Sequence, residues 1–424
     1  MLVKTISDEV VQKMIKELEI QKFLRKNPKN WREILCAPPY SLLIKEGEAS
    51  SAGAVLFKYD QKTSDFNIPL VKECRGIILD KDDNWNVIRY AYNKFFNYGE
   101  QFADDVDWST SQVQEKIDGS LMTVTFWKRK KTILVSTNGT INAFETPVMA
   151  QGGSFLDKCP YDTFGALFGA VMDEKCPDWM DTIERFPDFT FIFELVSPYN
   201  KIVVEYDKPD VYLTGIRNNK TFGEINPREL NYLFLEIERP KIYSLNGITE
   251  CLNAVEALNK NTQGVIENEG YVVVDRNWKR VKIKSPLYAM KHYLLDKPIT
   301  EKRVLEIIRM GEKDEFLTYC PNFKKEFDYV EEKLDGLYHE MEYLKDLTLE
   351  HLDMPQPEFV KIAKHYKKLA DWMYKCRKEN DLTPKEWLFG GRKYISKKGE
   401  EKITEGVFTD TIIELLGEDF DYEN

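Results

Sequence analysis

The chain has 424 residues, of which 42% are hydrophobic and 31% are charged, and its formal net charge is −11. This length is sufficient for two or three domains with sizeable cores. The sequence has no apolar run of about 18 residues and no signal-peptide pattern at its start, which predicts a soluble protein that is not exported. The acidic net charge argues against nucleic-acid binding, so such binding would have to rest on local basic patches.

The positions of cysteine and histidine limit the kinds of catalytic and metal-binding chemistry that the chain can carry. The seven cysteines stand singly, without a Cys-x-x-Cys pair, and their odd number argues against a disulfide framework and a zinc site. We therefore expect a reducing intracellular compartment such as the cytoplasm. The four histidines all lie at position 292 or later. Chemistry in the first two-thirds of the chain would accordingly use lysine, carboxylates and a metal ion.

The first predicted element is an amphipathic helix over residues 8–26. Ser7 is suited to cap its N-terminus, and Asp8 and Glu9 in the first turn suit the helix dipole. Short β-type runs separated by turn residues follow, and a helical stretch near residues 143–172 interrupts them. The predicted strands are 76–79, 113–116, 121–127, 132–136, 190–194, 202–205, 211–216, 271–274 and 280–284. The pattern predicts an α+β domain of antiparallel sheets with flanking helices over residues 1–288.

The remainder, residues 289–424, has the pattern of an all-helical C-terminal domain. A helix is predicted around residues 326–350, because its apolar positions are spaced alternately three and four apart: Phe327, Val330, Leu334, Leu337, Met341 and Leu344. After a break at residues 354–357, a second helix over 359–373 completes an αα-hairpin. Thr383-Pro384-Lys385-Glu386 is typical of the start of a third helix, with a capping residue, proline at the first position and a capping-box glutamate.

Six short segments carry the candidate chemistry. In chain order they are Glu73-Cys74-Arg75-Gly76, Lys94-Phe95-Phe96-Asn97, Lys116-Ile117-Asp118-Gly119-Ser120, the 193–203 stretch beginning Phe193-Glu194, Glu269-Gly270-Tyr271 and Lys282-Ile283-Lys284. Their order and spacing resemble the covalent nucleotidyltransferase superfamily and, within it, the phage-type RNA ligase 1 family. The resemblance covers about residues 70–290, and the tail is similar only in being helical.

The resemblance implies an N-terminal adenylyltransferase domain that uses ATP and Mg²⁺ or Mn²⁺. It assigns Lys116 as the nucleophile that forms lysyl-AMP, with Lys282 and Lys284 assisting. Glu269 would hold the metal directly or through water, and Glu194 would bind the ribose. The remaining ATP-binding candidates are Arg75 and Lys94 at the tail phosphates, Phe96 beside them, and Glu115, Asp118, Gly119 and Asn138 around the nucleotide.

Elementary chemistry supports a lysine nucleophile independently. An amine must be uncharged to attack the α-phosphate of ATP, because an ammonium has no lone pair. Neighbouring positive charge favours the neutral amine. Lys282 and Lys284, two apart on a predicted strand, lie on one face and can supply that charge. A metal ion would neutralise the triphosphate and assist the leaving group.

The residues alone leave the roles of some positions undecided. Family members often carry a basic residue just before Gly139, where this chain has Asn138, an amide that can hydrogen-bond the ribose but brings no charge. Arg217, just after a predicted strand, is a weaker candidate. A carboxylate inside the apolar run around Glu194 is costly unless partnered, which favours a functional role. One of Phe95 and Phe96 is expected to be plain core.

The predicted function is ATP-dependent sealing of RNA with 5′-phosphate and 3′-hydroxyl ends, in repair of tRNA-like molecules. No kinase or phosphatase motif is present, so a separate end-healing enzyme is an expected partner. The alternatives are a DNA ligase or capping guanylyltransferase, disfavoured by a helical tail without the late Arg-x-Asp-Lys-type motif, and a non-catalytic RNA-binding protein. The basic residues between Lys361 and Lys398 either contact RNA, as an RNA-specificity module, or form a solvated face beside the acidic helix.

Overall fold

The computed structural model describes residues 17–148, 159–200, 202–258, 266–294, 299–391, 393–395, 401–404 and 406–417. The chain divides into two compact units, Met1–His292 and Tyr293–Asn424, which are described separately. Among the described residues, no helix is long and apolar enough to span a membrane.

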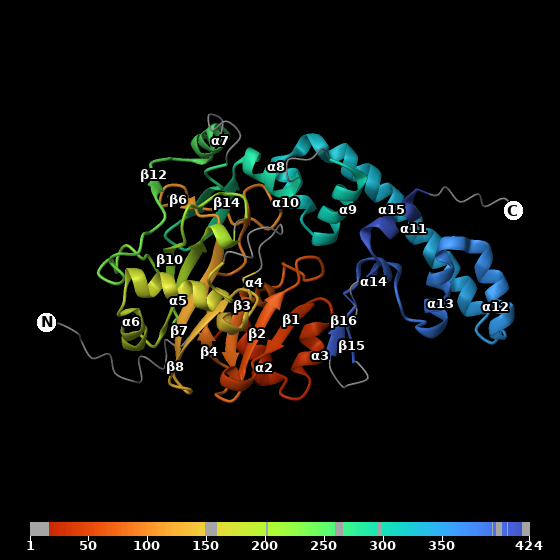
Figure 1. Cartoon of the computed structure of the whole chain (residues 1–424), viewed down its shortest axis with the longest axis horizontal. Helices are drawn as coiled ribbons and strands as arrows, with labels where there is room; N and C mark the ends of the chain where they lie inside the picture. The colour runs from red at the N-terminus through yellow and green to blue at the C-terminus, as the bar shows by residue number, and fades with distance from the viewer. Residues whose placement is uncertain are drawn as a thin grey trace. The chain divides into compact units, whose positions relative to one another are not determined.

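The first unit begins with a four-stranded antiparallel sheet in the order β1-β2-β3-β4 (Figure 1). Its strands are Leu42–Glu46, Ala54–Tyr59, Arg75–Asp80 and Asn86–Arg89. Helices α2 (Glu19–Lys26), α3 (Trp31–Cys36) and α4 (Pro69–Glu73) supply apolar side chains to one face, where Val55 and Phe57 lie. The other face packs through Leu56 and Ile78 against Trp127 and Leu134 of the second sheet.

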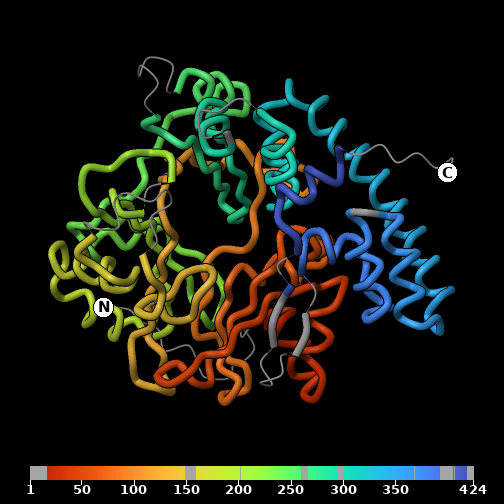
Figure 2. Tube along the Cα trace, turned by 45° about the vertical axis from the view of Figure 1, so that its right-hand side comes forward, coloured from red at the N-terminus to blue at the C-terminus, as the bar shows by residue number. Residues whose placement is uncertain are grey.

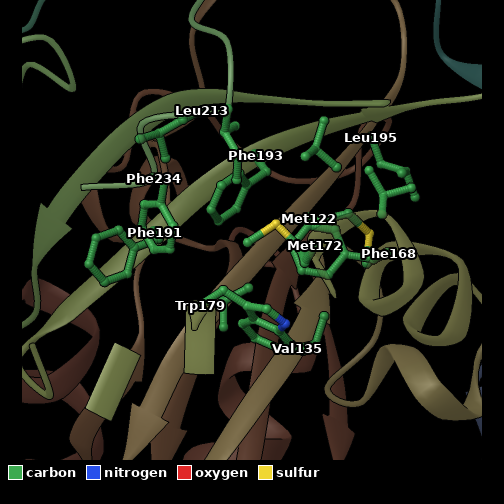
Figure 3. Packing of buried hydrophobic residues seen from close by; sticks show 14 of the residues in the cluster. Met122, Val135, Phe168, Met172, Trp179, Phe191, Phe193, Leu195, Leu213 and Phe234 are labelled. Carbon is green, nitrogen blue, oxygen red and sulfur yellow. The ribbon is translucent and has the colours of Figure 1, made fainter. Parts of the chain in front are cut away.

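The second sheet is antiparallel, in the order β11-β10-β9-β7-β8. Its strands are β7 (Ser120–Trp127), β8 (Thr132–Thr137), β9 (Phe189–Val196), β10 (Asp210–Asn218) and β11 (Glu224–Ile225). Helices α5 (Phe164–Lys175) and α6 (Trp179–Arg185) cover one face and enclose the largest apolar cluster of this unit. Figure 3 shows its centre, where the ring of Phe234 lies against those of Phe191 and Phe193, with centroids 5.2 and 5.7 Å apart.

The third sheet has the order β12-β6-β13-β14-β5. Its strands are β5 (Phe96–Asn97), β6 (Gln112–Lys116), β12 (Ile242–Tyr243), β13 (Gly270–Val274) and β14 (Arg280–Lys284). Strand β6 lies beside β13 although the two are far apart in the sequence, as the orange and green segments show in Figures 1 and 2. Helix α7 (Ile248–Ala257) packs on one face through Cys251 and Val255. Helix α8 (Pro286–Leu294) follows β14.

The second unit is helical, as predicted, with one addition. Its long helix α11 (Lys324–Glu350) buries all six positions of the predicted seam. A short two-stranded antiparallel sheet, β15 (Lys393–Ile395) with β16 (Glu401–Ile403), means that this unit is not all-helical. The other helices are α9 (Glu301–Met310), α10 (Lys313–Tyr319), α12 (Gln356–Ala363), α13 (Ala370–Lys378), α14 (Pro384–Phe389) and α15 (Thr409–Leu416).

The capping-box prediction at Thr383 is confirmed, since its hydroxyl accepts from Glu386 N and the Glu386 carboxylate accepts from Thr383 N. The helix predicted over 359–373 is instead α12, a 3₁₀ turn over Lys364–Leu369 and α13. The α+β class with antiparallel sheets is confirmed, with one parallel pairing, of β5 with β14. Eight of the predicted strands are present, seven with shifted ends and 280–284 with the predicted ends.

Three predictions in the first unit need correction. The predicted 8–26 helix is not continuous, because residues 17 and 18 are not helical and α2 begins at Glu19. The carboxylate of Glu73 accepts hydrogen bonds from the first backbone N–H groups of α2. Residues 8–16 lie outside the described residues. The stretch near 143–172 contains only a 3₁₀ turn over Ala143–Glu145 and the start of α5, with 149–158 outside the described residues. The predicted strand 202–205 does not form, because the N–H groups of Val203 and Val204 donate to Asp118 rather than to a neighbouring strand.

Candidate active site

Three strands of the third sheet place Lys116, Gly270 and Lys284 side by side. Gly270 of β13 pairs with Lys116 of β6 on one side and with Lys284 of β14 on the other. Side chains paired across strands share a face, and Tyr271 after Gly270 and Ile283 before Lys284 point toward α7. Both lysines, together with Lys282 two positions earlier, therefore lie on the face opposite α7.

Glu269 binds both lysines of this row. Its side chain is only 3% exposed, and its Oε2 lies 2.5 Å from Lys116 Nζ while its Oε1 lies 3.6 Å from Lys284 Nζ. A buried carboxylate is costly unless it is paired, and here two ammonium groups pair with it. Lys116 itself keeps 21% exposure, so its amine is reachable from solvent.

The glycine after Glu269 is required by the backbone. Gly270 has φ +147°, and a Cβ there would lie 2.2 Å from the carbonyl oxygen of Ile283. A side chain would therefore push β14 away from β13. The Glu-Gly dipeptide thus allows the close strand pairing that brings Lys284 to Glu269.

Asp118 and Gly119 fix the turn between β6 and β7. The buried Asp118 carboxylate accepts from Val203 N at 3.0 Å and Val204 N at 2.8 Å through Oδ2, and from the Tyr288 hydroxyl at 2.7 Å through Oδ1. A Cβ on Gly119 would lie 2.4 Å from the carbonyl oxygen of Leu195, so the turn packs directly on β9. These contacts hold Lys116 at the end of its strand and agree with the predicted role in shaping the turn.

Glu194 lies on the face of the second sheet opposite the apolar cluster, since its neighbours Phe193 and Leu195 point into that cluster. Burial raises the pKa of Glu194 to about 8. The positive charge of Lys116 opposes this rise, and the negative charge of Glu269 adds to it. Glu194 is therefore within electrostatic reach of the Lys116–Glu269 pair.

Arg75 and Lys94 both lie over aromatic rings. The Arg75 guanidinium is 4.8 Å from the Phe95 ring, and its buried Nη1 has no hydrogen-bond partner within the described part of the chain. Lys94 Nζ donates to Gln61 Oε1 at 3.0 Å and lies 4.9 Å from the centre of the buried Phe96 ring. Arg75 also interacts electrostatically with Glu194, which brings it to the same site as Lys116.

The side chains of two candidates, Glu115 and Arg217, do not contribute to the group of residues around Lys116. Glu115 pairs with Tyr271, which contributes to the α7 side of the sheet, so the Glu115 side chain lies on the face opposite Lys116. Arg217 lies within β10, where its guanidinium donates to the backbone oxygens of Ala91 and Phe222. Its environment is that of a buried structural arginine.

Asn138 follows β8 and receives a hydrogen bond from a residue that the motifs do not include. Arg89 Nη2 donates to Asn138 Oδ1 at 3.1 Å. Tyr288, whose hydroxyl donates to Asp118, was also not predicted. Its proximity to Lys284 along the chain is a signal that could have found it, whereas Arg89 ends a short strand without a motif.

Comparison with known proteins assigns the family. The profile described as RNA ligase, of the phage T4 RNA ligase 1 type, matches residues 73–288, which is half of the chain. The chain belongs to this RNA ligase family. All the motif residues from Arg75 to Lys284 that the structure places around Lys116 lie within the matched region.

Two relatives of this RNA ligase family member share 28% and 25% identity with it. An RNA ligase of Rhodothermus phage RM378 is 25% identical over 58% of this chain and 65% of its own length. A protein of Autographa californica nuclear polyhedrosis virus, named as a bifunctional polynucleotide kinase/RNA ligase, is 28% identical over 64% of this chain and 38% of its own length. The chain thus spans less than two thirds of each. Among solved structures, an archaeal ATP-dependent RNA ligase is similar with a TM-score of 0.42 and 14% identity, over 76% of this chain and 83% of that chain.

In the part of the chain that the structure describes, no cluster of three or more His, Cys, Asp or Glu side chains is suited to a metal ion. Mg²⁺ is commonly held by one or two carboxylates together with substrate phosphates. Glu269, a buried carboxylate beside the Lys116 amine, fits this arrangement.

Proposed function

We propose that this chain is an ATP-dependent RNA ligase that joins 5′-phosphate and 3′-hydroxyl RNA ends through an AMP adduct on Lys116. The observation that carries the proposal is the pairing of Lys116 Nζ with the buried Glu269 carboxylate, beside Lys284 and within reach of Glu194. A solvent-reachable amine among these groups is what nucleophilic attack on ATP requires.

The first step transfers AMP to the protein. The neutral amine of Lys116 attacks the α-phosphorus of ATP, a P–N bond forms, and the bond to the bridging oxygen of pyrophosphate breaks. Lys282 and Lys284 would attract the α-phosphate, whereas Glu269 holds the resting Lys116 in an ion pair. A bound Mg²⁺ or Mn²⁺ would neutralise phosphate charge and Glu269 together. If Glu269 then pairs with the metal ion, its ion pair with Lys116 would break and leave the Lys116 amine available.

The second and third steps seal the RNA. The 5′-phosphate oxygen of one RNA end attacks the AMP phosphorus, forming a phosphoanhydride and breaking the P–N bond to Lys116. The 3′-hydroxyl of the other end then attacks the RNA phosphorus, a phosphodiester forms, and AMP leaves. Developing negative charge on these phosphates would be stabilised by Lys282, Lys284 and the metal ion.

The remaining residues are assigned to nucleotide binding. Glu194 holds the ribose, and the unpartnered Arg75 Nη1 fits a phosphate oxygen of the ATP tail. Lys94 contacts the same tail after exchange of its Gln61 partner, with Phe96 packed beside it. Glu115 contributes through its backbone, because its side chain lies on the other face of the sheet. Asn138 and the Asp118-Gly119 turn border the nucleotide.

The substrate and partners are part of the proposal. Broken tRNA-like RNA is the proposed substrate, and the second unit is the proposed specificity module. Because the viral relative is named as a kinase and ligase in one protein, we propose that an end-healing kinase or phosphatase acts before this enzyme.

Mass spectrometry of the purified protein after incubation with ATP tests the reaction class. We expect an AMP adduct on Lys116 and sealing of 5′-phosphate RNA. The Lys116→Ala variant should lose both, and the control Lys128→Ala should keep both, because Lys128 also pairs with a carboxylate, that of Asp188, but on the surface. Adduct formation with GTP instead would indicate a capping enzyme, preferential sealing of nicked DNA would indicate a DNA ligase, and absence of any adduct would indicate a binding protein.

A further inference from the structure

Arg89, at the end of β4, is a buried cation to which the proposed reaction assigns no role. It is 0% exposed, and its guanidinium is held on three sides. Nε donates to Thr123 Oγ1 at 2.8 Å, Nη1 donates to the carbonyl oxygen of Gly76, and Nη2 donates to Asn138 Oδ1 at 3.1 Å. Burying a charge costs free energy that an apolar side chain would not cost, so packing alone does not account for a guanidinium here.

The contact with Arg89 fixes the orientation of Asn138. A guanidinium can only donate hydrogen bonds, so the amide oxygen of Asn138 must face it. The amide nitrogen, with its two N–H groups, then points away from Arg89. A hydrogen bond from a charged donor to Oδ1 also polarises the amide and strengthens Nδ2 as a donor.

The sheet register places this donor at the nucleotide site. Thr137, the last residue of β8, pairs with Met122, so Asn138 follows opposite Leu121, and Leu121 pairs with Glu194. Asn138 and Glu194 are thus two strand spacings apart, roughly 10 Å, at the same end of the sheet. A Cβ on Gly76 would lie 2.4 Å from the Asn138 carbonyl oxygen, so Asn138 also lies against the Arg75-Gly76 segment.

The surroundings of Asn138 are positively charged. The pKa of Arg89 is lowered by burial and then by the charge of Arg75, which places the two guanidinium groups within electrostatic reach of each other. Lys45 Nζ donates to the carbonyl oxygen of Gly139 at 2.7 Å. Arg75, Arg89 and Lys45, all from the first sheet, therefore lie around the uncharged Asn138-Gly139 turn. Their positive electrostatic potential favours an anionic oxygen as the hydrogen-bond acceptor there.

We propose that Arg89 is a positioning residue that presents the Asn138 amide as a donor to a β- or γ-phosphate oxygen of ATP. The first sheet would thereby supply positive potential to this turn through a neutral amide. This inference rests on the proposed function, because it needs ATP in the site.

The test measures adduct formation on Lys116 against ATP concentration, and its reversal against pyrophosphate concentration. If the wild-type protein forms no adduct, the proposed function fails before this inference is reached. The Asn138→Asp variant replaces the amide donor with an acceptor, while Arg89 can still pair with it and keep the fold. We expect at least a tenfold rise in the half-saturating concentrations of both ATP and pyrophosphate, and less than a threefold change in the maximal rate. The control Asn218→Asp should match the wild type, because Asn218 Oδ1 only accepts from backbone N–H groups.

Unchanged half-saturation by pyrophosphate in Asn138→Asp would overturn the proposal, even if that for ATP rose, because a contact with the ribose would behave in this way. The role of Arg89 is tested by Arg89→Lys in the wild-type and Asn138→Ala backgrounds. If Arg89 acts through Asn138, the rise caused by Arg89→Lys disappears in the Asn138→Ala background. Equal effects in the two backgrounds would contradict a positioning role. Should Arg89→Lys fail to fold, Asn138→Asp must still bind more weakly than Asn138→Ala, and the opposite order would also overturn the proposal.

Discussion

Lys116 forms an ion pair with Glu269 and is also the proposed nucleophile. The substitution Lys116→Arg separates these two roles. Lys116→Arg keeps a positive charge beside Glu269, so we expect the free energy of unfolding to change by less than about 1 kcal/mol. A guanidinium stays protonated at all working pH values, so it cannot attack ATP. The measurements are urea unfolding and mass spectrometry of the ATP-treated variant. Lys116→Ala, in contrast, leaves Glu269 with a weaker pair and should lose about 1–3 kcal/mol. An AMP adduct on the arginine variant would refute the assignment of the nucleophile.

Glu194 makes stability depend on pH. Its pKa is raised to about 8, mainly by burial, and lies above the ordinary value of 4.5. The folded state therefore binds this proton more tightly than the unfolded state, and stability is lost as pH rises from about 4.5 through 8. Glu194→Gln removes the titration. We expect the variant to lose less stability than the wild type between pH 5 and pH 9, by on the order of 1–2 kcal/mol after allowance for partial exposure.

Chemical unfolding of both proteins without nucleotide at the two pH values measures this difference. Glu115→Gln is the matched control, because its side chain lies on the other face of the third sheet. Parallel pH dependence in all three proteins would mean that Glu194 titrates normally.

At the scale of elements, motif residues were predictable where strand pairing alone determines their position. The alternation in β14 predicted that Lys282 and Lys284 share a face, and β13, which lies between β14 and β6, places Lys284 level with Lys116. The sequence did not reveal that Glu269 would bind both lysines, because that depends on the order of strands in the sheet. Arg89 was missed for the same reason, since its partners come from three separate segments.

The turn after Lys116 depends on the absence of a side chain at Gly119, and Gly139, in the turn after β8, allows a matched test. A Cβ at Gly119 would lie 2.4 Å from the Leu195 carbonyl oxygen, which belongs to a central strand. At Gly139 the nearest atom to such a Cβ is Lys58 Nζ at 4.0 Å. We expect Gly119→Ala to destabilise the protein by about 1–3 kcal/mol and to lower adduct formation at least tenfold. Gly139→Ala should be within about 0.5 kcal/mol of the wild type. Equal behaviour of the two variants, measured by thermal unfolding and adduct yield, would contradict the predicted close packing of this turn on β9.

The Asp118 carboxylate accepts the hydrogen bonds that the backbone N–H groups of Val203 and Val204 would donate in a strand pairing. This explains why the apolar run over 202–205 is not a strand. Asp118→Asn converts one accepting oxygen into a donor, so either the N–H groups of Val203 and Val204 or the Tyr288 hydroxyl lose a partner. A buried group left without a partner costs about 1–3 kcal/mol. Tyr288→Phe removes only one neutral donor and should cost about 1 kcal/mol. Hydrogen exchange at the amides of Val203 and Val204 distinguishes them. We expect faster exchange in Asp118→Asn alone, because even an amide oxygen that faces these N–H groups accepts more weakly than a carboxylate. Equal protection in both variants would contradict the role of Asp118 as their acceptor.

At the scale of the whole molecule, the net charge of −11 requires that RNA be attracted by a local surface. In the second unit, Lys361 and Lys364 are exposed at the end of α12 and the turn that follows it. If this surface contacts the phosphate backbone, Lys361→Glu together with Lys364→Glu should weaken RNA binding and lower the slope of log affinity against log salt by roughly 2. Adduct formation with ATP alone should be unchanged, because that step needs only the first unit.

The control is Lys325→Glu, which makes the same type of substitution at one exposed lysine of α11. Binding of a nicked tRNA-like RNA is measured by titration at several salt concentrations, and sealing is measured with RNA that is already adenylated at its 5′ end. Weaker binding with a smaller salt slope in the double variant, but not in the control, supports RNA contact at this surface. A double variant that binds and seals like the wild type would show that its lysines are a solvated face, and the attracting surface would then lie with the cations of the first unit.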